Sequence, residues 1–173
     1  MPLPNPLFHI ALWQPQIPNN TGNIGRTAMA TGCRLHLIHP LGFDLSEKAC
    51  RRAGMDYWKA VDFAEHPSWD AYLATAQPKN LWLFSARATR AFWDAPLSEG
   101  DHLLFGREED GIDPAIEVRV REQFGDDHLI TLPMVASPQA RSLNLATAVA
   151  CAVYEGLRQV RSATGRLPAA YHR

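Results

Sequence analysis

The chain has 173 residues, of which 46% are hydrophobic and 20% are charged. This length suits one globular domain, and this composition excludes a disordered or fibrous protein. The sequence has no run of about 18 apolar residues that could span a membrane. Its net charge of −1 argues against a uniformly basic nucleic-acid-binding surface.

The charge is unevenly distributed along the chain. Residues 1–55 carry a net charge of +3, residues 56–133 carry −8, and residues 134–173 carry +4. Two interpretations are open: chance variation over the surface, or an anionic partner bound where the two basic ends converge.

The pattern of apolar residues predicts alternating strands and helices. Short apolar runs with the length of strands buried on both faces lie at residues 7–13, 35–38, 81–84, 103–105 and 129–132. Helices are expected at residues 22–31, 46–53, 67–76, 114–123 and 142–163. This alternation predicts the α/β class, as an open, mostly parallel sheet with helices on both faces.

Several helix ends carry recognisable signals. Ser46 and Asp113 are expected N-caps, and Pro67 and Pro114 suit the first turns of their helices. We expect a single domain over residues 1–173, with its core at about residues 7–160. Residues 166–173 are expected to form a tail that is loose or docked on a partner.

The cysteines, the histidines and the first residues of the chain point away from secretion and from metal chemistry. Cys33, Cys50 and Cys151 form no C-x-x-C pair, so we expect buried, reduced thiols. The start of the chain has no basic segment typical of a signal peptide, so a cytoplasmic protein is expected. The seven histidines lack metal-ligand spacing and are interpreted as surface or hydrogen-bonded interior residues.

Ligands bind at the carboxyl ends of the strands in open parallel sheets, so the loops after the apolar runs are candidate sites. The first loop is PNNTGNIGRT at residues 18–27, whose glycines and asparagines would let the backbone approach an anion at a helix start. The alternative is an ordinary capped turn with Arg26 on a solvated helix face. The second is FGREEDGI at residues 105–112, where Glu108 could accept a hydrogen bond in a ligand loop or in a solvated turn.

The third candidate loop joins the last apolar run to the last helix. It runs from Leu132 past Met134 to Ser142 and Asn144. Ser142 is an expected N-cap, and Asn144, a poor helix former, is expected to make a contact of its own.

Taken in order, PNNTGNIGRT, FGREEDGI and LPMVASPQARSLNLATAVACAVYEGLRQ resemble the three motifs of the SPOUT (trefoil-knotted) RNA 2'-O-ribose methyltransferases. LHLIHPLGF at residues 35–43 and RRAGMDYW at residues 51–58 are similar to the branch that methylates the wobble nucleotide, cytidine or uridine 34, of tRNA. The resemblance covers about residues 7–160. It implies a C-terminal trefoil knot, a homodimer, the anticodon stem-loop of tRNA as partner, and S-adenosylmethionine as methyl donor, with S-adenosylhomocysteine as product and no metal.

The resemblance also implies roles for individual residues, by matching position. The methyl donor is expected to contact Phe84, Gly106, Leu132 and Ser142, with Glu108 and Met134 nearby.

The remaining implied roles concern catalysis and assembly. Arg26 matches the catalytic arginine, and because a guanidinium stays protonated we expect it to bind a phosphate and stabilise the developing alkoxide. Asn20 and Asn144 are candidates for orienting Arg26 or the ribose. Tyr154 matches a position at the dimer interface, and the alternative for it is an ordinary core aromatic residue.

Three other functions stay open at this point. The chain could methylate another RNA position or a base, it could bind RNA without catalysis while keeping the pocket, or it could be an unrelated nucleotide-binding α/β domain. The intact Arg26, Gly106, Glu108, Ser142 and Asn144 count against loss of catalysis.

Overall fold

The computed structural model describes residues 4–52, 55–135 and 142–165. Its strands form one seven-stranded sheet in the order β3-β2-β1-β6-β4-β7-β5, and all the paired neighbours are parallel. The predicted α/β class is confirmed. The strands are β1 (His9–Trp13), β2 (Arg34–Ile38), β3 (Phe63–His66), β4 (Leu81–Phe84), β5 (Arg90–Ala91), β6 (His102–Phe105) and β7 (Leu129–Thr131).

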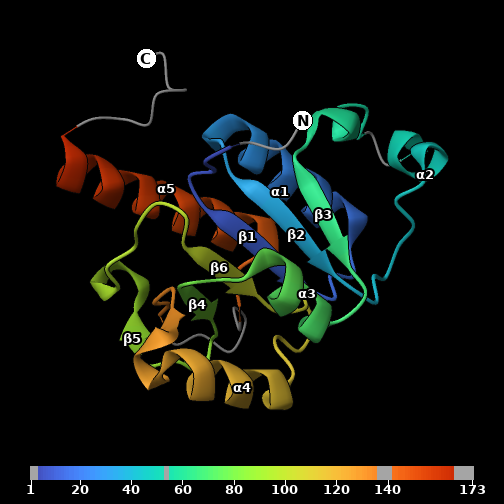
Figure 1. Cartoon of the computed structure of the whole chain (residues 1–173). Helices are drawn as coiled ribbons and strands as arrows, with labels where there is room; N and C mark the ends of the chain where they lie inside the picture. The colour runs from blue at the N-terminus through green and yellow to red at the C-terminus, as the bar shows by residue number, and fades with distance from the viewer. Residues whose placement is uncertain (1–3, 53–54, 136–141, 166–173) are drawn as a thin grey trace.

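Helices cover both faces of this sheet (Figure 1). α1 and α5 pack on one face, and α3 and α4 pack on the other. Among the described helices, none combines the length and the apolar character needed to cross a bilayer. The helices are α1 (Pro18–Thr31), α2 (Glu47–Arg52), α3 (Trp69–Ala76), α4 (Pro114–Phe124) and α5 (Leu145–Thr164), with short 3-10 turns η1 (Trp58–Ala60), η2 (Phe92–Asp94) and η3 (Asp126–His128).

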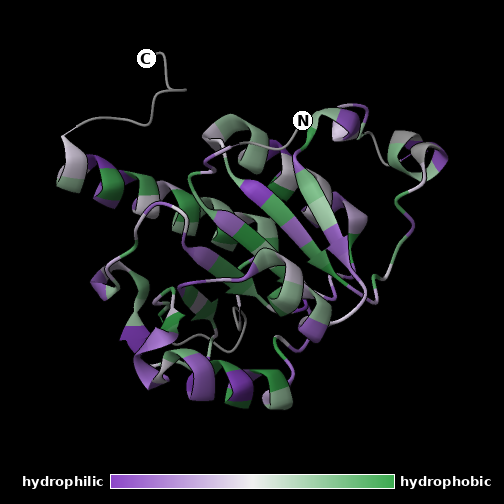
Figure 2. Ribbon diagram, viewed as in Figure 1, coloured by the Kyte–Doolittle hydropathy of each residue, from purple (hydrophilic) through white to green (hydrophobic). Residues whose placement is uncertain are grey.

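The central strands are apolar on both sides because each side faces a separate core. In β1, Ile10 and Leu12 join the core under α1 and α5, whereas Ala11 and Trp13 join the core under α3 and α4. Successive side chains of a strand point to opposite faces, so a continuous apolar run fits a strand covered on both sides. The outer side of α4 is hydrophilic, as expected for a helix that covers a sheet (Figure 2).

Two strands were not predicted, and both lie at the edges of the sheet. β3 and β5 are the outermost strands in the sheet order. Of the four residues of β3, only His66 is buried, and β5 has just two residues. An edge strand with a solvent-facing side needs no continuous apolar run, which is the signal that marked the five predicted strands.

Two of the predicted N-caps are confirmed. The carboxylate of Asp113 accepts a hydrogen bond from the backbone N–H of Ala115 at 2.8 Å, and the Ser46 hydroxyl accepts one from Ala49 N–H at 3.3 Å. Helix α3 begins two residues after Pro67, because Ser68 is its N-cap.

The predicted cap of the last helix is wrong. The N-cap of α5 is Asn144, whose side-chain oxygen accepts hydrogen bonds from the backbone N–H groups of Ala146 (2.9 Å) and Thr147 (3.3 Å). Ser142 lies two residues before this cap. Serine and asparagine both cap helices, and here the one next to Leu145, where the buried face of the helix starts, takes the role.

Helix α1 begins at Pro18, four residues before the predicted start, so the glycines of the first motif lie inside a helix. A Cβ atom added at Gly22 would lie 2.6 Å from the Sδ atom of Met55, and one added at Gly25 would lie 2.7 Å from Cζ3 of Trp58. These glycines bring α1 close to the segment around η1. They pack against Met55 and Trp58, so the expectation that they let the backbone approach an anion at the helix start is wrong.

The predicted trefoil knot is C-terminal, and part of the C-terminal region, in the connection between β7 and α5, is not described. Residues 136–141 of that connection lie outside the described residues, as does the predicted tail at 166–173. The knot and the tail stay predictions.

Candidate active site

A pocket of about 300 Å³ opens at the carboxyl ends of β4, β6 and β7. It lies where ligands bind in open parallel sheets, and its volume is at the lower end of the range for small-molecule sites. The four residues expected to contact the methyl donor, and the two expected nearby, are all among those that line it. The lining consists of Phe84, Ser85, Ala86, Arg87, Phe105, Gly106, Arg107, Glu108, Glu109, Asp110, Gly111, Ile112, Thr131, Leu132, Met134, Ser142, Leu143, Leu145 and Ala148.

One wall of the pocket is aromatic and aliphatic. Phe84 and Phe105 are the last residues of β4 and β6, and their rings stack with centroids 4.5 Å apart. Leu132 and Leu145 add aliphatic surface. Apolar walls with a few polar groups suit a ligand that has a flat ring system and polar substituents.

The opposite wall is the tight turn of the second motif. The backbones of Arg107 and Gly111 exchange two hydrogen bonds, of 2.9 and 3.1 Å, and Gly111 has a φ of +76°. The Arg107 guanidinium donates two hydrogen bonds to the Asp110 carboxylate, at 2.7 and 2.6 Å. A Cβ atom at Gly106 would collide with backbone atoms of Gly111 and Ile112. Gly106 therefore allows the turn to fold back against the strand end.

Glu108 connects this turn to the start of α1. Its carboxylate accepts hydrogen bonds from Gln16 N–H (2.9 Å), Ile17 N–H (3.2 Å) and the side-chain amide of Asn20 (3.2 Å). A carboxylate is favourable at a helix N-terminus, where N–H groups lack partners within the helix. The predicted acceptor role of Glu108 is confirmed, and its donors belong to the protein. Glu108 follows β6 and its donors follow β1, which is the neighbouring strand. The sheet continues from β1 through β2 and β3 on one side and from β6 through β4, β7 and β5 on the other, so the contact lies at the switch point of the sheet.

Asn20 and Asn144 extend this network to the third motif. The Asn144 side-chain amide donates to the side-chain oxygen of Asn20 at 2.9 Å. The chain of contacts Asn144–Asn20–Glu108 therefore links all three motifs beside the pocket. In the described part of the chain, neither asparagine hydrogen-bonds to Arg26, so the contact expected of Asn144 is made with Asn20.

Arg26 lies on the exposed side of α1 and is outside the residues that line the pocket. Its guanidinium carbon is 4.6 Å from the centre of the Tyr57 ring, and the Tyr57 hydroxyl donates to the backbone carbonyl of Gly22 at 2.8 Å. No carboxylate among the described residues forms an ion pair with Arg26, whereas Arg87 and Arg107 each have such a partner. Within a single chain, the position of Arg26 therefore agrees with the alternative interpretation, in which it lies on a solvated helix face.

The two basic ends of the sequence meet in the fold. Helix α1, which carries Arg26, packs against α5, which carries Arg158 and Arg161. This juxtaposition agrees with the interpretation that the uneven charge marks one region of the molecule. Part of the charge on α5 is internally paired, because Arg158 donates two hydrogen bonds to Glu155.

Tyr154 projects from α5 into solvent with 56% of its surface exposed. The alternative of an ordinary core aromatic residue is therefore wrong. Met134 and Leu143, near the pocket, are also exposed, at 40% and 42%.

The histidines are closer together than their spacing in the sequence suggested. His9, His36 and His102 come from three neighbouring strands and place nitrogen atoms within 4.8 Å of one another. The interpretation of hydrogen-bonded interior residues is confirmed for His36, His66 and His102. Their spacing along the chain gave no sign that the fold would bring them together. Local sequence patterns do not reveal the order of the strands in the sheet, and it is this order that brings His9, His36 and His102 together.

The chain matches the family model described as "SpoU rRNA Methylase family" over residues 7–154. It belongs to this family. A relative from Saccharophagus degradans (strain 2-40 / ATCC 43961 / DSM 17024), named tRNA (cytidine(34)-2'-O)-methyltransferase, is 42% identical over 154 residues, which are 89% of this chain and 96% of the relative.

Solved structures show the same relationship. One described as "Structural insights into the 2-OH methylation of C/U34 on tRNA" is 44% identical, with a TM-score of 0.76 over 91% of this chain and 92% of its own. An AdoMet-bound rRNA methyltransferase from Sinorhizobium meliloti has a TM-score of 0.72 at 23% identity, over 91% of this chain and 58% of its own, which shows a shared fold. The resemblance of the three motifs to RNA methyltransferases is confirmed.

Proposed function

We propose that this protein transfers a methyl group from S-adenosylmethionine to the ribose 2'-hydroxyl of the wobble nucleotide, cytidine or uridine 34, in the tRNA anticodon loop. The observation that carries the proposal is the convergence of three motifs on one pocket, in a chain 42% identical to a relative named for this reaction. S-adenosylhomocysteine is the second product.

The pocket residues fit the methyl donor. The aromatic and aliphatic wall at Phe84 and Leu132 suits a nucleoside, and the polar groups of Ser142 and of the turn after Gly106 can hydrogen-bond its substituents. Met134 adds a flexible side chain at the rim. Bound S-adenosylmethionine supplies a methyl group on a positively charged sulfur, which makes that carbon electrophilic. This chemistry calls for no metal ion.

Glu108 is a positioning residue in this proposal. Its carboxylate is already bonded to Gln16, Ile17 and Asn20, so its contribution is to hold the turn beside the pocket. Correct placement of the reacting groups accounts for a large part of the rate of such a transfer.

Arg26 is the proposed catalytic residue. Its exposed guanidinium has no carboxylate partner among the described side chains, so its charge is available to an RNA phosphate and to the developing 2'-alkoxide. It remains protonated, so the hydroxyl proton passes to phosphate or water. Tyr57, under the guanidinium, limits where it can lie.

A homodimer in the cytoplasm is the proposed active form. Arg26 lies outside the pocket lining of its own chain, and α5, which packs against α1, exposes Tyr154. Pairing through this region would build the tRNA-binding groove from two chains. Sedimentation during turnover tests this proposal, because an active monomer would overturn it.

The function is tested by incubating the protein with labelled S-adenosylmethionine and individual tRNA transcripts, and by mapping the methylated nucleotide. We expect label on the ribose of nucleotide 34. Arg26→Ala should abolish transfer while donor affinity stays nearly unchanged. Arg119→Ala is the matched control, because Arg119 pairs with Asp70 on the opposite face of the sheet. Failure to label any tRNA would refute the function, and near-normal turnover by Arg26→Ala would refute the role of Arg26.

A further inference from the structure

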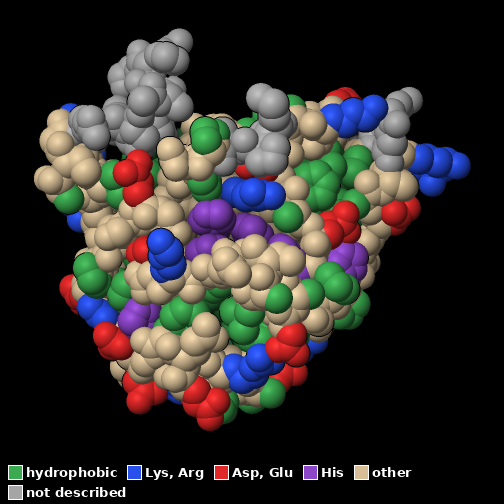
Figure 3. Space-filling view, viewed as in Figure 1, with side chains coloured by type: hydrophobic (Ala, Val, Ile, Leu, Met, Phe, Trp, Pro, Cys, Tyr) green, Lys and Arg blue, Asp and Glu red, His purple; other side chains and the backbone are tan. Residues whose placement is uncertain are grey.

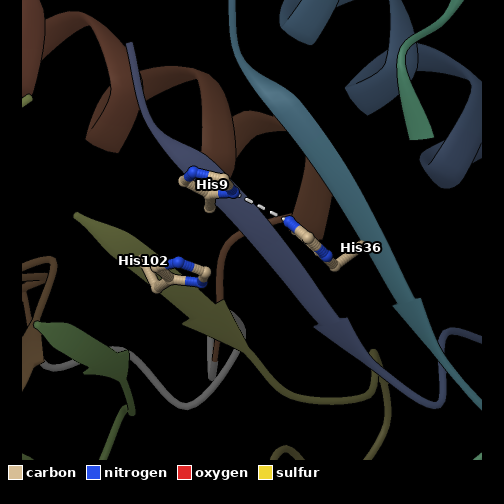
Figure 4. Close-up of side chains that lie close together, drawn as sticks. All are labelled: His9, His36 and His102. Atoms are coloured by element: carbon tan, nitrogen blue, oxygen red, sulfur yellow. Dashed lines mark hydrogen bonds between the residues drawn. The ribbon is translucent and has the colours of Figure 1, made fainter. Parts of the chain in front are cut away.

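A cluster of histidines lies on the sheet face covered by α3, at the opposite strand ends from the methyl-donor pocket. His9 and His102 are the first residues of β1 and β6 and pair directly across the ladder, and His36 lies in β2 (Figure 4). Histidine side chains gather at the surface on this side of the molecule (Figure 3). From His9 to Trp13 at the carboxyl end, β1 spans about 13 Å. The cluster is thus separate from the pocket.

Hydrogen bonds fix the ring of His36. The Thr75 hydroxyl donates to the Ala71 carbonyl at 2.7 Å, so in its 3.0 Å contact with His66 Nδ1 its oxygen accepts. His66 Nε2 is then unprotonated and accepts from His36 Nδ1 at 2.9 Å. The remaining nitrogen of His36, Nε2, carries a lone pair, and it points at His9 Nδ1, 2.9 Å away.

His102 is held in a similar way. Its Nδ1 is hydrogen-bonded to the buried hydroxyl of Tyr72 at 2.6 Å, which leaves Nε2 as its second nitrogen. The ring of His9 stacks on that of His102, with centroids 4.2 Å apart and planes 4° apart. His9 is only partly buried, so its ring can turn out of this stack. Metal-binding histidines generally have their second ring nitrogen held by a neighbouring polar group, as Tyr72 and His66 hold these.

The cluster is electrically neutral at physiological pH. Burial lowers the pKa of His9 to about 4, that of His36 to about 2 and that of His102 to about 3. Neutral imidazole is the form that binds metal ions. Arg34, whose charge acts on both His9 and His36, lies 3.6 Å from the carboxylate of Asp62, which offsets that charge.

We propose that His9, His36 and His102 form a binding site for a divalent transition-metal ion of the Zn²⁺ type. One nitrogen from each lies within 4.8 Å of the others. Bonds of about 2.0–2.1 Å to a tetrahedral zinc ion separate two nitrogens by about 3.3 Å. As the metal binds, the proton that His9 Nδ1 shares with His36 would move to Nε2 of the same neutral His9 ring, and the 2.9 Å contact between the two rings would open by a few tenths of an ångström. Water would take the fourth position, on the exposed side of His9.

The metal would tie three strands together rather than take part in methyl transfer. β2, β1 and β6 are consecutive in the sheet, and the chain order of the sheet reverses between β1 and β6. Imidazole ligands from these strands would join the two halves of the sheet at their amino ends. Glu108 already joins the loops after β1 and β6 at the carboxyl ends.

The test uses the full chain without a polyhistidine tag, freed of metal with a chelator. Zn²⁺ is titrated by calorimetry, and Co²⁺ is titrated by its visible absorption, which is intense when coordination is tetrahedral. We expect one equivalent of metal per chain and a higher thermal unfolding midpoint with Zn²⁺. His9→Gln should weaken Zn²⁺ binding at least tenfold and remove the tetrahedral Co²⁺ spectrum.

His39→Gln is the matched control, because His39 is outside the cluster and pairs with the exposed Glu65. It should bind metal like the unaltered chain. Absence of stoichiometric Zn²⁺ binding by the unaltered chain would overturn the proposal without reference to any variant. Undiminished binding by a folded His9→Gln protein, with folding checked by circular dichroism, would overturn it as well.

Discussion

Replacing Glu108 by glutamine tests whether the contacts between the second motif and α1 hold the pocket wall in place. One carboxylate oxygen accepts from both Ile17 N–H and the Asn20 amide, and the other accepts from Gln16 N–H. The best orientation of a glutamine amide keeps its oxygen on the first pair. Its NH₂ group then faces Gln16 N–H, donor against donor.

The magnitude follows from these three hydrogen bonds. A hydrogen bond to a charged group contributes about 1.5–3 kcal/mol and a neutral one about 1 kcal/mol, so two bonds are weakened and the third is lost. Partial exposure of the site allows water to replace part of this loss. We expect Glu108→Gln to lower the free energy of unfolding by about 2 kcal/mol, which corresponds to a midpoint lower by about 4–8 °C in a domain of this size.

The assay is urea and thermal unfolding followed by circular dichroism, with Glu109→Gln as the matched control. Glu109 is exposed and belongs to the same turn, and its substitution should change stability by less than about 0.5 kcal/mol. Equal stabilities of the Glu108→Gln and Glu109→Gln proteins would refute the reasoning.

Three further substitutions test other parts of the structure. Asn144→Ala removes the α5 cap and should cost about 1–2 kcal/mol in urea unfolding; a cost below about 0.3 kcal/mol would contradict the assigned cap. Gly25→Ala places a methyl group against the Trp58 ring and should cost about 1–3 kcal/mol, and unchanged stability would show that α1 is not tightly packed there. Gly106→Ala sets a Cβ atom against the backbone of Gly111, so calorimetry should show S-adenosylmethionine affinity reduced at least tenfold; unchanged affinity would mean that this turn does not form the pocket wall.

The buried strands were predictable because each is a continuous apolar run in the sequence. The pocket was predictable because the three motifs occur along the chain in a recognisable order. Residues on strands buried on both faces form continuous apolar runs. Phe84 is the last residue of β4, and Gly106 and Leu132 come directly after β6 and β7. Parallel strands bring their carboxyl ends to one edge, so these residues meet there.

The remaining features depend on contacts between segments distant in sequence. The sequence places Gly22 at the start of a helix and not inside one, because nothing near it in the chain reveals Met55, which packs against it. His9 and His102 pair because β6 inserts beside β1, and that strand order is set by the whole sheet. Ser142 and Asn144 are equally good caps by residue type, and the buried start of α5 decides between them.

The central claim is methyl transfer to a ribose 2'-hydroxyl at nucleotide 34, and a substrate that lacks this one oxygen tests it most directly. Two anticodon stem-loop RNAs, identical except for ribose or 2'-deoxyribose at position 34, are incubated with the protein and labelled S-adenosylmethionine. The proposal predicts label in the ribose substrate and none in the deoxyribose substrate. Equal labelling of the two would contradict it, because the acceptor would then be a base or another nucleotide.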